Sequence, residues 1–185
     1  WSKVYKLQAI SLRLFNVYGT RSRTSGTYGA VFGVFLSQKL KNFPLTVVGN
    51  GKQMRDWIHV QDHVDALITL SENTKIPPGE IYNIGADNEF TNIELVKLIC
   101  TICDNEIPNK TGPYSSLIDF VDDRPGHDNR YSLNSKKIAE HSDWKPKVEF
   151  LQGLESTIKW YIKNHKSLTK YFQSKYDGKR IGLGS

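Results

Sequence analysis

The chain has 185 residues, 38% of them hydrophobic, which is enough for one domain with a core and excludes disordered and fibrous classes. No apolar run approaches the roughly 20 residues of a membrane span, and the amino terminus lacks the apolar stretch of a secretory signal, so we expect a cytoplasmic protein with no membrane partner. The net charge of +6 gathers in lysines near the carboxyl terminus, which is typical of a solvated face, and we expect no nucleic-acid partner.

The first half of the chain predicts strands and helices in alternation. Residues 9–19 (AISLRLFNVYG) follow a short helix end and predict one β-strand that closes on a glycine. A loop rich in Ser, Thr and Gly leads into an apolar helix over residues 30–40, and a short strand over residues 45–49 follows. Residues 57–60 predict the next strand, which leads into a helix over residues 63–73.

Local signals mark the starts of two helices. Asp62 is placed to cap the helix that follows the strand at residues 57–60. After that helix, residues 80–86 predict a strand. Thr91 and Glu94 then form a capping box for a helix at residues 92–103.

The remainder predicts one strand and two helices, over residues 118–123, 132–142 and 150–164. Helices and strands therefore alternate along the whole chain, which is typical of an α/β protein. No linker is long enough to separate two domains, so we treat residues 1–185 as one unit.

Three patterns suggest sites that we reject. Gly26, Gly29 and Gly33 open a helix after a strand, but the spacing is GxxGxxxG and the following strand does not end in an acidic residue, unlike a dinucleotide fingerprint. The HExxH zinc motif needs one continuous helix and a glutamate after the first histidine. The segment from His59 to His63 has Val60 at that position, and a change from strand to helix is predicted between the two histidines. The two cysteines, Cys100 and Cys103, fall on or beside an apolar helical stripe and indicate core packing. We expect no metal site.

The informative polar residues are dispersed along the chain. They are two arginines, one histidine and three asparagines: Asn16, Arg55, Asn83, Asn92, Arg124 and His127. A nucleotide diphosphate needs fixed, planar positive charge for its pyrophosphate, and arginine supplies bidentate donors. Together with amide and imidazole donors, the two arginines suit such a ligand.

Five ordered segments of the chain resemble the extended short-chain dehydrogenase/reductase family of NAD-dependent nucleotide-sugar dehydratases and epimerases. These segments are RLFNVYG, PLTVVGNGKQMRDWIHVQDHVDAL, GEIYNIGADNEFTNIELV, DRPGHDNRYSLNSKKI and WKPKVEFLQGLESTIKWY. The resemblance implies an α/β fold in which the last strands and helices of a Rossmann-like doubly wound sheet are interleaved with a small substrate-binding subdomain. It also implies that the NAD-binding half is absent from this sequence, and that full-length relatives form homodimers.

The resemblance further implies roles for individual residues. Asn16 would hydrogen-bond the sugar diphosphate, and the backbone near Val17 would lie against the nicotinamide ring. Arg55 and Arg124 would clamp the pyrophosphate. Asn92 and the RPGHD segment with His127 would meet phosphate or ribose. The base and sugar pocket would be lined by the backbone near Ala30, Val31, Thr46 and Val48.

Family members carry GxxGxxG and a YxxxK pair ahead of the FNVYG strand, and in them the tyrosine takes a proton as hydride passes to NAD. We expect both motifs to be absent here, so no catalytic residue is assigned, and we expect the chain alone to be an inactive fragment, split-gene product or truncated protein. The favoured function is the substrate-binding part of a dTDP-glucose 4,6-dehydratase. A UDP-hexose 4-epimerase and a non-catalytic nucleotide-sugar-binding module are the alternatives.

Overall fold

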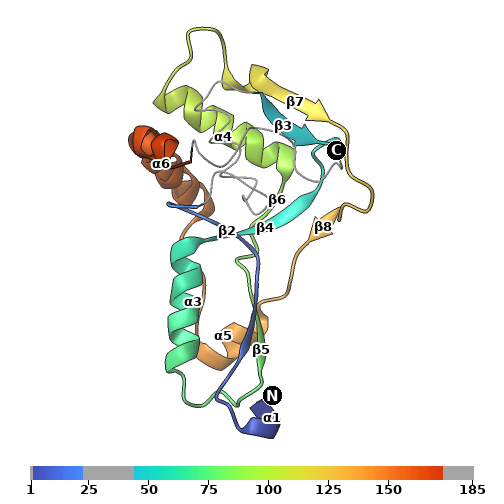
Figure 1. The fold of residues 1–185 in the computed structure, drawn as a ribbon, viewed down its shortest axis with the longest axis vertical. Coiled ribbons are helices and arrows are strands. Elements are labelled where there is room, and N and C mark those ends of the chain that lie inside the picture. The colour runs from blue at the N-terminus through green and yellow to red at the C-terminus, as the bar shows by residue number, and fades with distance from the viewer. Residues whose placement is uncertain (1, 23–43, 173–185) are drawn as a thin grey trace.

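A computed structural model describes residues 2–22 and 44–172 (Figure 1). In chain order its elements are α1 (Ser2–Tyr5), β1 (Ser11–Leu14), β2 (Asn16–Tyr18), β3 (Leu45–Val48), β4 (Met54–His59), α3 (Val60–Glu72), β5 (Ile81–Ile84), β6 (Glu89–Thr91), α4 (Asn92–Glu106), a 3-10 helix (Tyr114–Leu117), β7 (Ile118–Val121), β8 (Arg130–Tyr131), α5 (Lys136–Ser142) and α6 (Phe150–Phe172). Between the described ranges lie the predicted helix at residues 30–40 and the glycine-bearing loop before it.

Parallel pairing dominates the described strands. β1 pairs with β5, β3 with β7, and β4 with both β2 and β8, all in parallel, while β4 and β6 are antiparallel. With helices between the strands, this arrangement confirms the predicted α/β class. Strand β4 lies at the centre, because three other strands pair with it.

The strand predicted at residues 9–19 is wrong as a single element. Its first part, β1, pairs with β5 up to Leu14, and its second part, β2, pairs with β4 from Asn16 onward. Phe15 lies between them and is buried. The chain changes sheets at this residue, because the two parts have different partners, and a local sequence pattern does not report which strand a segment will join.

The buried side chains form two hydrophobic cores. The upper core in Figure 1 joins α4 and α6 to β3, whereas the lower core joins α3 and α5 to β5. Strand β4 contributes to both, since Trp57 belongs to the upper core and its neighbour Ile58 to the lower one. Successive strand residues point to opposite faces. Cys100 and Cys103 are buried in the upper core, which confirms the packing role predicted for them.

The capping box of α4 is confirmed. Thr91 Oγ1 accepts a hydrogen bond from the Glu94 amide, and Glu94 Oε2 accepts one from the Thr91 amide at 2.8 Å. The cap predicted for α3 is wrong, because this helix begins directly after β4 and its N-cap is His59. Asp62 instead lies inside the first turn, where its buried carboxylate accepts the backbone N–H groups of Lys147 and Val148 at 2.8 and 3.1 Å.

None of the helices in the described ranges is long and apolar enough to cross a membrane.

Candidate functional site

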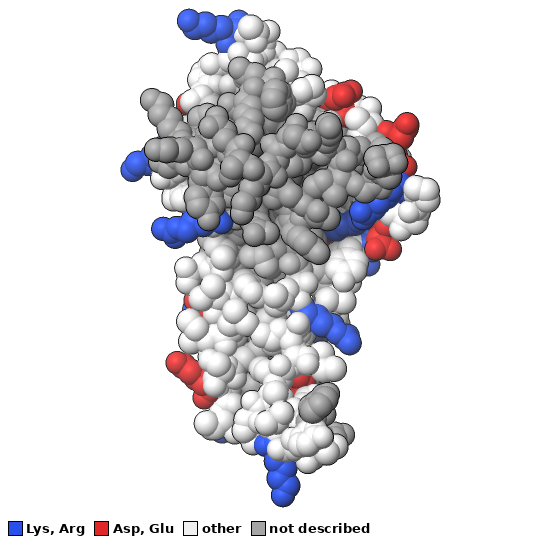
Figure 2. Space-filling model, in the orientation of Figure 1, with Lys and Arg blue, Asp and Glu red and all other residues white. Residues whose placement is uncertain are grey.

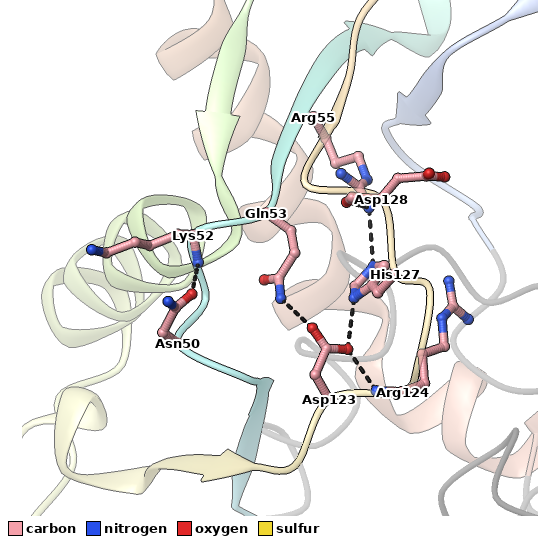
Figure 3. Close-up of polar contacts among 8 residues, drawn as sticks. All are labelled: Asn50, Lys52, Gln53, Arg55, Asp123, Arg124, His127 and Asp128. Atoms are coloured by element: carbon pink, nitrogen blue, oxygen red, sulfur yellow. Dashed lines mark hydrogen bonds and ion pairs between the residues drawn. The ribbon is translucent and has the colours of Figure 1, made fainter.

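Three of the predicted site residues come together at the start of β4. Arg55 lies on this strand, and Arg124 and His127 lie on the β7–β8 loop (residues 122–129), which crosses it (Figure 3). Arg55 Nη2 lies 3.0 Å from His127 Nε2 and donates to the Asp128 carbonyl oxygen at 3.0 Å. Arg55 Nη1 donates to the Met54 carbonyl oxygen at 2.7 Å. The guanidinium is thus held by contacts from its own strand and from the loop.

Two further residues, Gln53 and Asp123, complete this cluster, and neither was predicted from the sequence. Asp123 Oδ1 lies 2.9 Å from His127 Nδ1 and accepts the Arg124 amide at 2.7 Å, while its Oδ2 accepts Gln53 Nε2 at 2.7 Å (Figure 3). The spacing of four between Asp123 and His127 is the one local signal that could have indicated their contact. No such signal links Gln53 to Asp123, because they are 70 residues apart.

Two guanidinium groups and the carboxylates of Asp123 and Asp128 lie together in this cluster, and Arg55 is partly shielded from water. The pKa of Arg55 lies below its ordinary value, mainly because burial disfavours the charged form; the nearby Asp128 opposes this shift and the positive charge of Arg124 adds to it. Within the described residues the Arg124 guanidinium has no hydrogen bond or ion pair, and Figure 3 shows it extended away from the Asp123 carboxylate. Two guanidinium groups that repel each other would both be stabilised by an anion between them.

Charged groups of both signs lie together at the edge of the molecule where Figure 1 places β8 (Figure 2). Besides the residues of the cluster, Arg130 and Glu89 form an ion pair there, with Nη2 and Oε1 2.5 Å apart. The arginines of the cluster therefore lie in a polar surface region.

Asn16 and Val17 lie on β2, next to β4. Asn16 pairs in register with Trp57 and donates from Nδ2 to the Asp56 carbonyl oxygen at 3.3 Å, so it lies beside the strand that carries Arg55. Val17 is half-buried and pairs with Ile58.

Thr46 and Val48 are the half-buried residues of β3, in alternation with Leu45 and Val47, which belong to the upper core. They therefore share the face of β3 that points away from that core. Strand β3 leads into Gly49, whose amide donates to the carbonyl oxygen of Val121 at 2.7 Å, and so ends beside the β7–β8 loop. The other two predicted lining residues, Ala30 and Val31, lie outside the described residues.

Asn92 begins α4 and is buried, and its amide donates to the Gln53 carbonyl oxygen at 3.0 Å. Its buried Oδ1 atom has no hydrogen-bond partner in the described part of the chain. Such an acceptor suits a hydroxyl group, whereas the NH₂ group of the same side chain suits a phosphate oxygen. Asn83 is not part of the cluster, because its Nδ2 donates to the Asn134 carbonyl oxygen at 3.1 Å.

Comparison with known proteins decides the family. The family model for GDP-mannose 4,6 dehydratase matches residues 1–157. The chain belongs to this family. It is 38% identical over 186 residues to the dTDP-glucose 4,6-dehydratase of Escherichia coli, covering 99% of this chain and 50% of that protein, and 38% identical over 170 residues to the Haemophilus influenzae enzyme of the same name, covering 90% and 48%. The family resemblance seen in the sequence is confirmed.

Solved structures of similar proteins support the fold of this family member. The dTDP-glucose 4,6-dehydratase of Streptomyces venezuelae, solved with NAD and TYD bound, has a TM-score of 0.77 and 30% identity, with 90% of this chain and 47% of that one covered. The UDP-glucose 4-epimerase of Thermotoga maritima, solved with UDP-glucose, has a TM-score of 0.76 and 27% identity, with 89% and 49% covered. The chain spans about half the length of the relatives that it matches.

One expectation for this family member is wrong as stated. Tyr171 and Lys175 have the YxxxK spacing, so that spacing is present in the chain. The pair comes after residue 157, where the family match ends, whereas the resemblance places the catalytic pair ahead of the FNVYG segment. It therefore does not occupy the position of the family's catalytic pair.

The glycine pattern rejected as a dinucleotide site, at Gly26, Gly29 and Gly33, lies outside the described residues. Such a site needs a glycine-rich turn between a strand and a helix. Within residues 44–172, β4 passes directly into α3 and β6 directly into α4, without a glycine between them. Among the described residues there is also no group of three or more His, Cys, Asp or Glu side chains that could hold a metal ion.

Proposed function

We propose that this chain is the substrate-recognition part of an NAD-dependent nucleotide-sugar dehydratase of the dTDP-glucose 4,6-dehydratase type. The observation that carries the proposal is the convergence of Arg55 and Arg124 from segments far apart in the sequence, in a member of this family. The 38% identity to dTDP-glucose 4,6-dehydratases supports the dehydratase reaction, which oxidises the sugar at C4 and then eliminates water.

The two arginines would bind the pyrophosphate of the substrate. Arg55 is held in place by three hydrogen bonds, and the exposed Arg124 guanidinium is free of partners among the described residues. The fixed guanidinium of Arg55 and the less constrained one of Arg124 can bind a diphosphate from two directions, with bidentate hydrogen bonds that lysine could not make. Each such charge-assisted bond contributes about 1.5–3 kcal/mol.

The other predicted residues would contact the nucleoside and the sugar. Asn16 lies beside β4, where its amide could reach the sugar diphosphate, and Asn92 has a buried acceptor that suits a ribose hydroxyl. Thr46 and Val48 would line the base pocket from β3. His127, which lies beside Arg55, would contact phosphate or ribose.

NAD would be held mainly by residues outside those described here, and the contact proposed for Val17 stays a prediction.

The part of the relatives that has no counterpart in this chain would pack on the lower part of the molecule. Among the described strands β1 pairs only with β5, and a cavity of about 700 Å³ lies between β1 and α3. Exposed apolar side chains occur on these elements, namely Leu14, Val64, Leu67, Ile68 and Ile81. Figure 2 shows a mostly uncharged face there.

Isothermal titration calorimetry of this chain with dTDP, UDP, GDP and NAD tests the proposal. We expect saturable binding of dTDP, weakened by about tenfold to a hundredfold in Arg124→Ala, since 1.4 kcal/mol corresponds to a factor of ten. Arg130→Ala is the matched control, because Arg130 lies on β8, directly after the loop that carries Arg124, but forms a surface ion pair with Glu89.

Each other result has a definite meaning. Stronger binding of UDP than of dTDP would favour the epimerase reaction. Equal dTDP binding by wild type and Arg124→Ala would contradict the pyrophosphate role. Absence of binding from a folded chain would contradict the proposal that this part of the protein recognises the nucleotide by itself.

A further inference from the structure

His127 lies between a negative and a positive side chain. Its Nδ1 is 2.9 Å from Asp123 Oδ1, and its Nε2 is 3.0 Å from Arg55 Nη2. Arginine can only donate hydrogen bonds, so the contact with Arg55 requires an unprotonated Nε2. The ionised carboxylate can only accept, so the contact with Asp123 requires a proton on Nδ1. Only the neutral ring with its proton on Nδ1 satisfies both contacts.

The Asp123 carboxylate is itself fixed by three residues from two segments of the chain. Besides His127 it accepts the Arg124 amide from its own loop and Gln53 Nε2 from the segment before β4, each at 2.7 Å. Gly49, after β3, leaves room for this arrangement: a Cβ there would lie 3.2 Å from both Asp123 Oδ2 and Gln53 Nε2, and the glycine has a positive φ of 59°. The carboxylate is therefore rigidly placed although it is partly exposed.

We propose that Asp123 is a positioning residue, which sets the tautomer of His127 and through it the orientation of the Arg55 guanidinium. With Nε2 of His127 as acceptor, three of the five N–H donors of Arg55 are directed to Met54, His127 and Asp128. The N–H of Nε and the second N–H of Nη1 remain for a ligand. The role of Asp123 in ligand binding rests on the proposed pyrophosphate site, whereas its effect on the tautomer of His127 does not depend on that site.

Orientation before binding matters because a freely rotating arginine loses side-chain entropy when it engages a ligand. If Asp123 were absent, the ring of His127 could carry its proton on Nε2, and that N–H would face the N–H groups of Arg55. The guanidinium would then lose an acceptor and turn away.

The tautomer can be measured without any ligand. In long-range ¹H–¹⁵N spectra at about pH 8, above the ordinary histidine pKa of about 6.5, the pattern of ring cross-peaks distinguishes the two neutral tautomers. The signals of His127 are assigned by their loss in His127→Gln. We expect the Nδ1–H form in wild type and in Asp123→Asn, whose carboxamide oxygen can still accept, and a shift toward the Nε2–H form in Asp123→Ala. An Nε2–H ring in wild type, or an unchanged ring in Asp123→Ala, would overturn the proposal.

Binding of dTDP by the same variants separates positioning from charge. Removal of an acidic side chain near an anion site should strengthen anion binding if only charge mattered. Positioning predicts the opposite for Asp123→Ala, a loss of about tenfold in affinity, with near wild-type affinity or better in Asp123→Asn. Asp128→Ala is the matched control, since it removes a neighbouring carboxylate and leaves the backbone carbonyl that Arg55 uses.

The outcomes remain distinguishable from failure of the proposed function. If wild type does not bind dTDP, the pyrophosphate site is contradicted, and the spectra alone decide whether Asp123 sets the tautomer. If wild type binds and Asp123→Ala binds as tightly or more tightly while it stays folded by circular dichroism, the positioning role is wrong.

Discussion

Arg55 Nη2 and His127 Nε2 lie 3.0 Å apart, although 72 residues separate the two side chains along the chain. The contact forms because β8 pairs in parallel with the start of β4 and the Met54 amide donates to the Asn129 carbonyl oxygen at 2.7 Å. The β7–β8 loop is thereby held across Arg55. A short two-residue strand thus brings both halves of the proposed anion site together.

Replacement of Arg55 by lysine tests whether this geometry, rather than charge, matters. A lysine ammonium is a point charge and cannot reproduce the planar set of donors that contacts Met54, His127 and Asp128. We therefore expect Arg55→Lys to weaken dTDP binding by about tenfold, or about 1.4 kcal/mol, measured by calorimetry. Arg130→Lys should leave the affinity unchanged. Wild-type affinity in Arg55→Lys would show that positive charge alone suffices.

The pH dependence of stability should report on Asp123. Partial loss of solvent raises the pKa of Asp123, but hydrogen bonds from His127, the Arg124 amide and Gln53 outweigh this and hold the pKa below its ordinary value of 3.8. The unfolded chain therefore binds the proton more tightly than the folded one. The stabilisation is fully present above pH 3.8 and is lost as the pH falls through the lowered pKa of the folded state.

We expect the difference in melting temperature between wild type and Asp123→Asn to shrink as the pH is lowered below 3.8, and to be constant above about pH 5. The pKa of Glu94 is also lowered, first by its hydrogen bond with Thr91, so Glu94→Gln serves as a comparison from another region. A difference that does not depend on pH would show that the Asp123 carboxylate has the same proton affinity in both states.

Local signals predicted the cap of one helix, α4, but not that of another, α3. The capping box of α4 was predictable because Thr91 and Glu94 contact each other across three residues. The cap of α3 was not, because β4 passes into the helix without an intervening turn and His59 serves as both the last strand residue and the cap. Asp62, three residues later, instead ties down the segment that leads into α6.

The residues of the candidate site also divide into those that the sequence predicts and those that it does not. Arg55, Arg124 and His127 were predictable because their chemistry and their family context are written in the sequence. Gln53 was not, because its only signal is a hydrogen bond to a residue 70 positions away, which depends on how β3, β4 and β7 are arranged. Likewise the change of sheet at Phe15 depends on the two partner strands, not on the residues of the segment itself.

The buried carboxylate of Asp56 should be important for stability. It is fully buried and accepts the Asn88 amide at 2.8 Å and the Ala86 amide at 3.3 Å, so it fixes the turn between β5 and β6. Asp56→Ala leaves two partly buried amides without an acceptor, and we expect a loss of about 3 kcal/mol in the free energy of unfolding by urea titration. The exposed Asp87 in the same turn is the control, and Asp87→Asn, which tolerates its positive φ, should change stability by less than about 0.5 kcal/mol. Equal effects of the two changes would contradict the structural role of Asp56.

The contact of α6 with β2 depends on the absence of a side chain at Gly153. A Cβ at this position would lie 2.5 Å from the Tyr18 hydroxyl oxygen, which donates to the Phe150 carbonyl at 3.3 Å. Gly153→Ala should therefore destabilise the fold by about 1–3 kcal/mol through overpacking, although alanine favours a helix by about 1 kcal/mol over glycine. In a Tyr18→Phe background the hydroxyl is gone and the alanine has more room. Urea titration of the two single variants and the double variant should then give a favourable coupling of about 1–2 kcal/mol. Gln152→Ala, at the exposed neighbouring position, is the control and should show no coupling with Tyr18→Phe. Additive effects of Gly153→Ala and Tyr18→Phe would contradict the prediction, because they would mean that the helix shifts to accommodate the methyl group.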